Sequence, residues 1–106
     1  MKKKAVTRAS EMYAIIANER YGLYVGIVDE YNVTTRVVRA REVRHVARWY
    51  GRTGGITSLA VYGLCGPEAA QSRIGAPVVS ATLTGIVNVF ECTKIARSTF
   101  ENSVQS

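Results

Sequence analysis

The sequence predicts an α+β fold that is mainly β: an antiparallel β-meander, or small barrel-like sheet, with two or three short helices. Two observations predict it. Three segments rich in β-forming residues follow one another at hairpin spacing between residues 12 and 39. A further β-rich segment covers residues 78–90, and only short helical patterns lie between the two regions. We therefore expect two or three short helices beside one antiparallel sheet.

The length and composition predict one globular domain. The chain has 106 residues, a formal net charge of +6 and 47% hydrophobic residues, which excludes a largely disordered protein. We expect a basic flexible arm at residues 1–10, which contains Lys2, Lys3 and Lys4, followed by a single domain at 11–106. No apolar run approaches the ~18 residues of a membrane span, and no apolar segment follows the lysines as in a secretion signal. An intracellular protein is the resulting expectation.

The first three strands are predicted at residues 12–18, 23–30 and 33–39. Residues 19–22 end in glycine and form the first turn. Tyr31 and Asn32 fit a short hairpin connection, because asparagine tolerates positive φ. The third segment continues with β-branched residues suited to a pleated surface. Together these segments predict an antiparallel meander.

The next segment, residues 41–50, is compatible with a helix or a strand. At helical spacing Ala40, Val43 and Ala47 share one side and the arginines share the other, whereas the strand alternation is poor. Residues 52–55 are predicted to form a loop, and residues 56–62 a short helix that ends at Gly63.

The last third of the chain is predicted to be irregular first and then ordered. Residues 64–77 contain both prolines and no periodicity, so we expect irregular structure there. Strands follow at residues 78–79 and 82–90. Thr93 is a suitable N-cap for a final helix at residues 94–100.

Several segments together resemble a family of small uncharacterised domains encoded mainly by bacteriophages and prophages. The matching segments, which are spread over residues 13–93, are residues 22–26, 37–38, 40–41, 58–60, 72–78, 82–84 and 92–93. Related sequences carry a tryptophan-rich stretch after the Ala-Arg pair, whereas this chain has His45 there and its only tryptophan at Trp49. The resemblance implies a viral origin, and with it a location in the cytoplasm of an infected bacterium or in the virion. It implies no chemistry.

The sequence predicts no enzyme, no cofactor and no metal site. His45 and Asp29 are the only residues of their kinds, and they lie in separate segments, with no nucleophile motif around any serine. Cys65 and Cys92 are too few for a zinc site, and without a secretion signal we expect them to be reduced.

The strongest functional signal is a cluster of arginines around the aromatic residues. Arginine binds phosphate through two parallel hydrogen bonds, and aromatic rings stack on bases. The cluster therefore suits an anionic ligand with a flat ring. The candidate ligand-binding residues are Arg41, Arg44, Arg48, Trp49, Tyr50 and Arg52.

Three functions fit this signal. The first is an oligomeric, phage-encoded module that captures a nucleotide-type small molecule and so sequesters a host immune signal. The second is nucleic-acid binding by the basic arm and the arginines. The third is a virion structural or decoration protein. The alternative without a ligand is a solvated basic face whose arginines pair with glutamates or with a partner subunit.

Overall fold

The computed structural model describes residues 12–50 and 55–103, so the predicted basic arm at residues 1–10 and Arg52 lie outside the described residues. The elements are the strands β1 (Met12–Asn18), β2 (Gly22–Asn32), β3 (Val37–Arg48), β4 (Arg73–Ile74), β5 (Val78–Leu83) and β6 (Ile86–Glu91), the helices α1 (Ile56–Tyr62) and α2 (Lys94–Glu101), and the 3₁₀ helix η2 (Ala69–Gln71).

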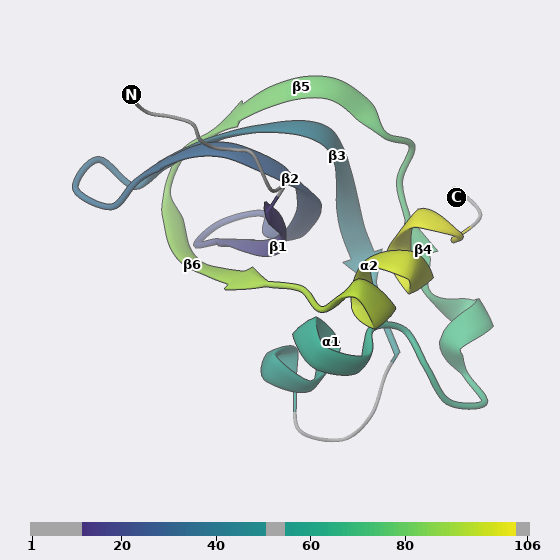
Figure 1. Cartoon of the computed structure of the whole chain (residues 1–106). Helices are drawn as coiled ribbons and strands as arrows, with labels where there is room; N and C mark the ends of the chain where they lie inside the picture. The colour runs from purple at the N-terminus through teal and green to yellow at the C-terminus, as the bar shows by residue number, and fades with distance from the viewer. Residues whose placement is uncertain (1–11, 51–54, 104–106) are drawn as a thin grey trace.

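The six strands form one antiparallel sheet in the order β4-β3-β2-β1-β6, with β5 also paired to β3. The predicted meander is confirmed as β1, β2 and β3. The sheet is open, so the barrel-like alternative is wrong. β1 and β3 are the two outer strands of the meander. β5, which pairs with β3, is nevertheless joined to β6, which pairs with β1, by only the two residues Thr84 and Gly85 (Figure 1). This short connection curves the sheet strongly.

Both predicted helices are present, and they lie next to each other at one end of the sheet (Figure 1). Thr93 is the N-cap of α2, as expected, and its hydroxyl oxygen accepts a hydrogen bond from the amide of Ala96 at 3.1 Å. The same hydroxyl donates to the carbonyl of Val61 in α1 at 2.5 Å. Thr93 therefore begins one helix and fastens it to the other. Neither described helix has the length and apolar character that crossing a membrane requires.

The second hairpin corrects the predicted boundaries. Tyr31 and Asn32 belong to β2, and the turn covers residues 33–36, which we expected to begin the third strand. The reason is local hydrogen bonding: the Asn32 side chain accepts from the amide of Thr35 at 3.0 Å, and its carbonyl accepts from the amide of Arg36 at 2.8 Å. Asn32 acts through its side chain and not through a positive φ of its own.

Residues 41–48 are a strand, which resolves the ambiguity of that segment. Between the pairs Val25–Arg44 and Ile27–Arg41, β3 has two residues where β2 has only Gly26. This is a β-bulge, and Glu42 adopts a φ of +52° within it. The extra residue shifts the alternation of buried and exposed side chains by one position, so the sequence pattern does not look like a regular strand.

The later part of the chain differs from expectation in three places. Residues 78–79, expected to form a separate short strand, belong to the continuous strand β5. The segment 64–77, expected to be irregular, contains η2 and β4. The single strand expected at residues 82–90 is interrupted at Gly85, whose φ of +64° turns the chain from β5 into β6.

The core occupies both faces of β1, where adjacent side chains point in opposite directions. Ile15 belongs to a cluster that packs with Leu59 and Phe100 of the helices. Ile16 belongs to a second cluster, which packs between β3, β5 and β6. β3 supplies side chains to both clusters. The same strand carries the predicted site residues Arg41, Arg44 and Arg48, which therefore lie beside the core.

Candidate functional site

Arg44, one of the candidate ligand residues, lies inside the protein. It is only 6% exposed. Its guanidinium donates hydrogen bonds to the carbonyls of Gly75 at 2.6 Å, Phe100 at 2.7 Å and Ser103 at 3.1 Å. The Phe100 carbonyl lies in the last turn of α2 and the Ser103 carbonyl follows just after the helix, where a cation is favourable. Arg44 therefore joins β3 to α2 and to the loop after β4, which is a structural role.

Arg41 lies on the exposed face of the sheet and is engaged by an acidic neighbour. Its Nε donates to both carboxylate oxygens of Asp29, at 2.9 and 3.1 Å. Both side chains are nearly half exposed, so the pair contributes at most about 1 kcal/mol to stability.

Arg48, Trp49 and Tyr50 lie at the end of β3, away from Arg41. Arg48 is exposed and pairs across the strands with Arg73, which is exposed as well. Trp49 packs against the core cluster beneath the helices. The amide of Tyr50 donates to the Ser72 hydroxyl at 3.0 Å. The structure therefore separates the described candidate residues into three environments and does not gather them in one hollow.

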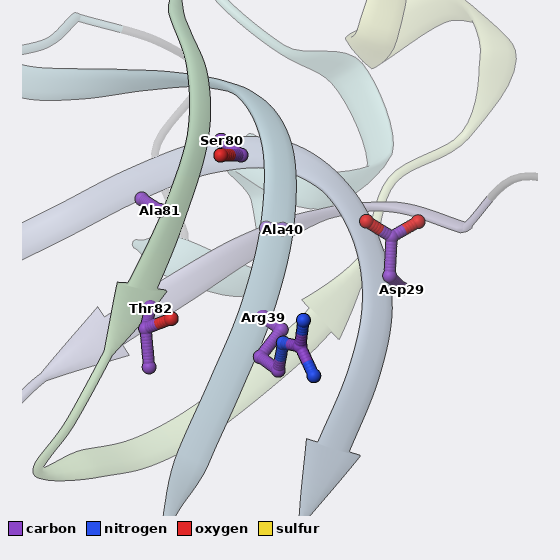
Figure 2. A pocket seen from close by; sticks show the side chains of 6 residues that line it. All are labelled: Asp29, Arg39, Ala40, Ser80, Ala81 and Thr82. Atoms are coloured by element: carbon purple, nitrogen blue, oxygen red, sulfur yellow. The ribbon is translucent and has the colours of Figure 1, made fainter.

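A first hollow lies beside Arg41, between β2, β3 and β5. Its lining includes Asp29, Arg39, Ser80 and Thr82, as Figure 2 shows, and its volume is about 190 Å³. Arg39 is paired with Glu30 at 3.6 Å. The hollow is small, and its charge is nearly balanced, because Arg39 is paired with Glu30 and Asp29 is paired with Arg41.

A second hollow, which we call the turn hollow, lies where the β1–β2 turn meets the β5–β6 connection. Its volume is about 360 Å³, and its lining residues are Asn18, Glu19, Arg20, Tyr21, Arg36, Thr84 and Gly85. The Tyr21 side chain is largely free, since the residue is 63% exposed. Arg20 has no ion-pair partner within the described part of the chain. The turn hollow thus combines two arginines with an accessible ring.

Local hydrogen bonds hold the turn hollow in shape. The side-chain oxygen of Asn18 accepts from the amides of Arg20 and Tyr21, both at 2.7 Å, and its amide nitrogen donates to the carbonyl of Thr84. The carbonyl of Gly85 accepts from the amide of Glu19 at 3.0 Å. One asparagine therefore orders the turn and ties it to the β5–β6 connection.

Arg36 reaches the turn hollow from the β2–β3 hairpin with an unusual backbone. Its φ is +59°, a region that favours glycine or asparagine. Its guanidinium is 3.5 Å from a carboxylate oxygen of Glu19, and both side chains are about half exposed. An arginine kept in this strained conformation at a hollow is a functional candidate.

A third hollow, of about 180 Å³, is lined by Tyr13, Glu42, Arg44, Pro77 and Glu101. Tyr13 is 4% exposed, and burial raises the pKa of its hydroxyl well above the usual 10.0. Burial likewise raises the pKa of Cys92 from 9.0 to about 12, so this thiol stays protonated at neutral pH. Neither group has the lowered pKa of an activated nucleophile.

The other candidate groups for catalysis do not meet. The Nε2 of His45 lies 3.0 Å from the carbonyl of Tyr21, and its ring lies against Tyr24 with centroids 5.0 Å apart. Asp29 is engaged with Arg41 instead. Among residues 12–50 and 55–103, no three histidine, cysteine or acidic side chains lie together as metal ligands would.

The chain matches a known protein family. The family model of DUF6948, a domain of unknown function, matches residues 11–100. The chain belongs to this family. No curated protein and no solved structure matches this DUF6948 chain.

Sequence reasoning missed the residues of the turn hollow in this DUF6948 domain. Arg20 and Tyr21 belong to the turn before β2 and Arg36 to the turn after it, at opposite ends of that strand. The β5–β6 connection brings the two turns together, because the amide of Glu19 donates to the carbonyl of Gly85 and the amide of Ile86 donates to the carbonyl of Arg36. A weak signal is present in the sequence, because Tyr21 is a large aromatic residue in a turn that small or polar residues usually occupy. The many arginines of β3 were the stronger signal in the sequence, and they pointed to a different part of the chain.

Proposed function

We propose that this protein is a non-enzymatic binding module for a small anionic ligand that carries a flat ring, such as a nucleotide, and that the turn hollow is its binding site. The observation that carries the proposal is the juxtaposition of Arg20, Arg36 and the exposed ring of Tyr21 around about 360 Å³ of space. Arginine recognises phosphate through paired hydrogen bonds, and a tyrosine ring stacks on a base.

The size of the turn hollow favours it over the other two. Ligand sites usually measure about 300–1,000 Å³, a range that only the turn hollow reaches among the three described here. Its charge also favours an anion. Glu19 offsets Arg36 at a loose 3.5 Å, and Arg20 has no ionic partner among the residues that the structure describes. A phosphate would replace Glu19 as the partner of Arg36.

The biological role that we propose is capture of a soluble nucleotide signal in a bacterial host by a phage-encoded protein. A binding module without a reaction centre can act by sequestration alone. The basic character of the chain, with a net charge of +6, favours attraction of such an anion from a distance.

A second candidate function is nucleic-acid binding, and the Arg48–Arg73 pair favours it. These two exposed arginines lie directly opposite each other on neighbouring strands, an arrangement that repulsion destabilises. A phosphate backbone along this edge would relieve the repulsion. The binding would then weaken steeply with salt, in proportion to the number of phosphates contacted.

Isothermal titration calorimetry with cyclic and linear nucleotides tests the first proposal. Arg20→Ala and Arg36→Asn should each weaken binding at least about tenfold, the loss of one charge-assisted phosphate contact. Asparagine suits position 36 because it tolerates a positive φ. The matched control is Arg39→Ala, which removes an exposed, ion-paired arginine outside the turn hollow.

Two results would overturn the assignment. One is the absence of heat with every nucleotide tested. The other is an equal loss of affinity in the Arg39→Ala control, which would indicate general electrostatic attraction. Duplex and single-stranded DNA titrated at low and high salt test the nucleic-acid alternative, for which Arg48→Ala and Arg73→Ala should reduce the salt dependence.

A further inference from the structure

Strand β5 has the features of an edge that pairs with another chain. It pairs with β3 on one side, and no strand of the described residues pairs with its other side. Figure 2 shows β5 running alongside β3, with Ser80, Ala81 and Thr82 labelled on it. A free edge exposes backbone donors and acceptors that can template a further strand.

The usual protection of a free edge is absent from β5. Its six residues, VVSATL, include no charged residue and no proline. The register with β3 runs without a shift from Val38–Leu83 to Val43–Val78, so no extra residue bends β5 away. Natural edges are normally protected by lysine, proline or a bulge.

An exposed valine extends the core face of β5 beyond the part that the described residues cover. Ala81 and Leu83 pack against the core cluster between β3, β5 and β6. Alternation along the strand puts Val79 on the same face, yet it is 86% exposed. The residue across from Val79 on β3 is Glu42, the bulge residue with a positive φ.

We propose that β5 pairs with β5 of a second copy of this chain, antiparallel and about a two-fold axis at Ala81. This register places Val79 opposite the partner's Leu83 and Ser80 opposite the partner's Thr82. Apolar side chains then meet on the core face and hydroxyl groups meet on the outer face, both of which are favourable cross-strand pairs. The proposal does not depend on the ligand proposed for the turn hollow.

A second copy fits this edge electrostatically in spite of the net charge. The two arginines of β3 nearest to β5 on the outer face are Arg39 and Arg41, which are ion-paired with Glu30 and Asp29. On the outer face, two copies can therefore approach along β5 without bringing uncompensated arginine charge together. The contact between two six-residue strands is small compared with stable protein interfaces. The dimer should therefore have a dissociation constant of about 10 μM or above.

Analytical ultracentrifugation of the full chain tests the pairing between about 1 μM and about 1 mM, the range in which weak interfaces associate. The wild type should shift from monomer to dimer, and Val79→Lys should remain monomeric. The control is Val33→Lys, which places the same charge at a 71% exposed valine of the β2–β3 turn and should dimerise as the wild type does. A monomeric wild type, or unchanged association of Val79→Lys, would overturn the proposal.

Cross-linking tests the register. Ala81→Cys, in a chain that also carries Cys65→Ser and Cys92→Ala, should form an intermolecular disulfide under mild oxidation. Directly opposite residues on antiparallel strands have Cα atoms about 4.5–5.5 Å apart, within reach of a disulfide. Val33→Cys in the same background should give little dimer on a non-reducing gel. If Ala81→Cys gives no more dimer than Val33→Cys, the proposed register is wrong.

Discussion

Replacing Arg44 by alanine should destabilise the protein severely, because a buried guanidinium then no longer supports two elements. Three hydrogen bonds of 2.6–3.1 Å are lost, to Gly75, Phe100 and Ser103. Each bond to a charged donor is worth about 1.5–3 kcal/mol, and desolvation of the guanidinium offsets part of that gain. Arg44 also lines a hollow of about 180 Å³, from which water could enter the space that the side chain leaves. We expect a net loss of about 3–4 kcal/mol.

Urea denaturation followed by circular dichroism measures this loss as a lower midpoint. The matched control is Arg48→Ala, which removes an exposed arginine from the same strand and should change the free energy of unfolding by less than about 1 kcal/mol. Arg44→Lys should recover only part of the stability, since one ammonium cannot reach acceptors on both elements. If Arg44→Ala and Arg48→Ala have equal midpoints, Arg44 does not hold β3 to α2, and its assignment as a structural residue is wrong.

Three further predictions concern packing, capping and pH. Gly26→Ala should cost about 1–3 kcal/mol in thermal unfolding, because a Cβ there would lie 3.0 Å from the Arg41 carbonyl and 3.1 Å from Val43 Cγ2. Thr93→Ala should cost about 1 kcal/mol, and Thr93→Ser should restore most of it, since the cap needs only the hydroxyl. The melting temperature should fall as the pH rises from 9.0 towards 12. Buried Cys92 and Tyr13 have raised pKa values and stay neutral when folded, whereas the unfolded chain releases their protons. A melting temperature that stays constant over this range would contradict that burial.

The sequence predicts the regular parts of this fold well, because they depend on local patterns. The strand at residues 12–18, the meander and both helices are confirmed. Thr93 is an example of such a local pattern, because its hydroxyl caps α2 by accepting a hydrogen bond from the amide of Ala96, only three positions along the chain. The predicted position of the turn at Asn32 was wrong by a few residues. The side chain and the carbonyl of Asn32 both accept hydrogen bonds from the residues that follow, so the turn comes after Asn32.

Long-range features were not accessible from the sequence. The bulge at Glu42 exists because Gly26, on another strand, leaves room for it, and the bulge is what obscured the strand pattern of residues 41–48. The role of Arg44 depends likewise on carbonyls about 30 to 60 positions away. A cluster of arginines in the sequence therefore became, in the fold, one structural cation, one surface ion pair and one exposed strand end.

A nuclear magnetic resonance titration of the labelled protein with a nucleotide tests the central claim most directly, because it locates the ligand. Our account predicts that the largest amide shifts occur at Asn18, Arg20, Tyr21, Arg36 and Gly85, and that they saturate together. Shifts centred on Arg48 and Trp49 instead, or no saturable shifts at all, would contradict it.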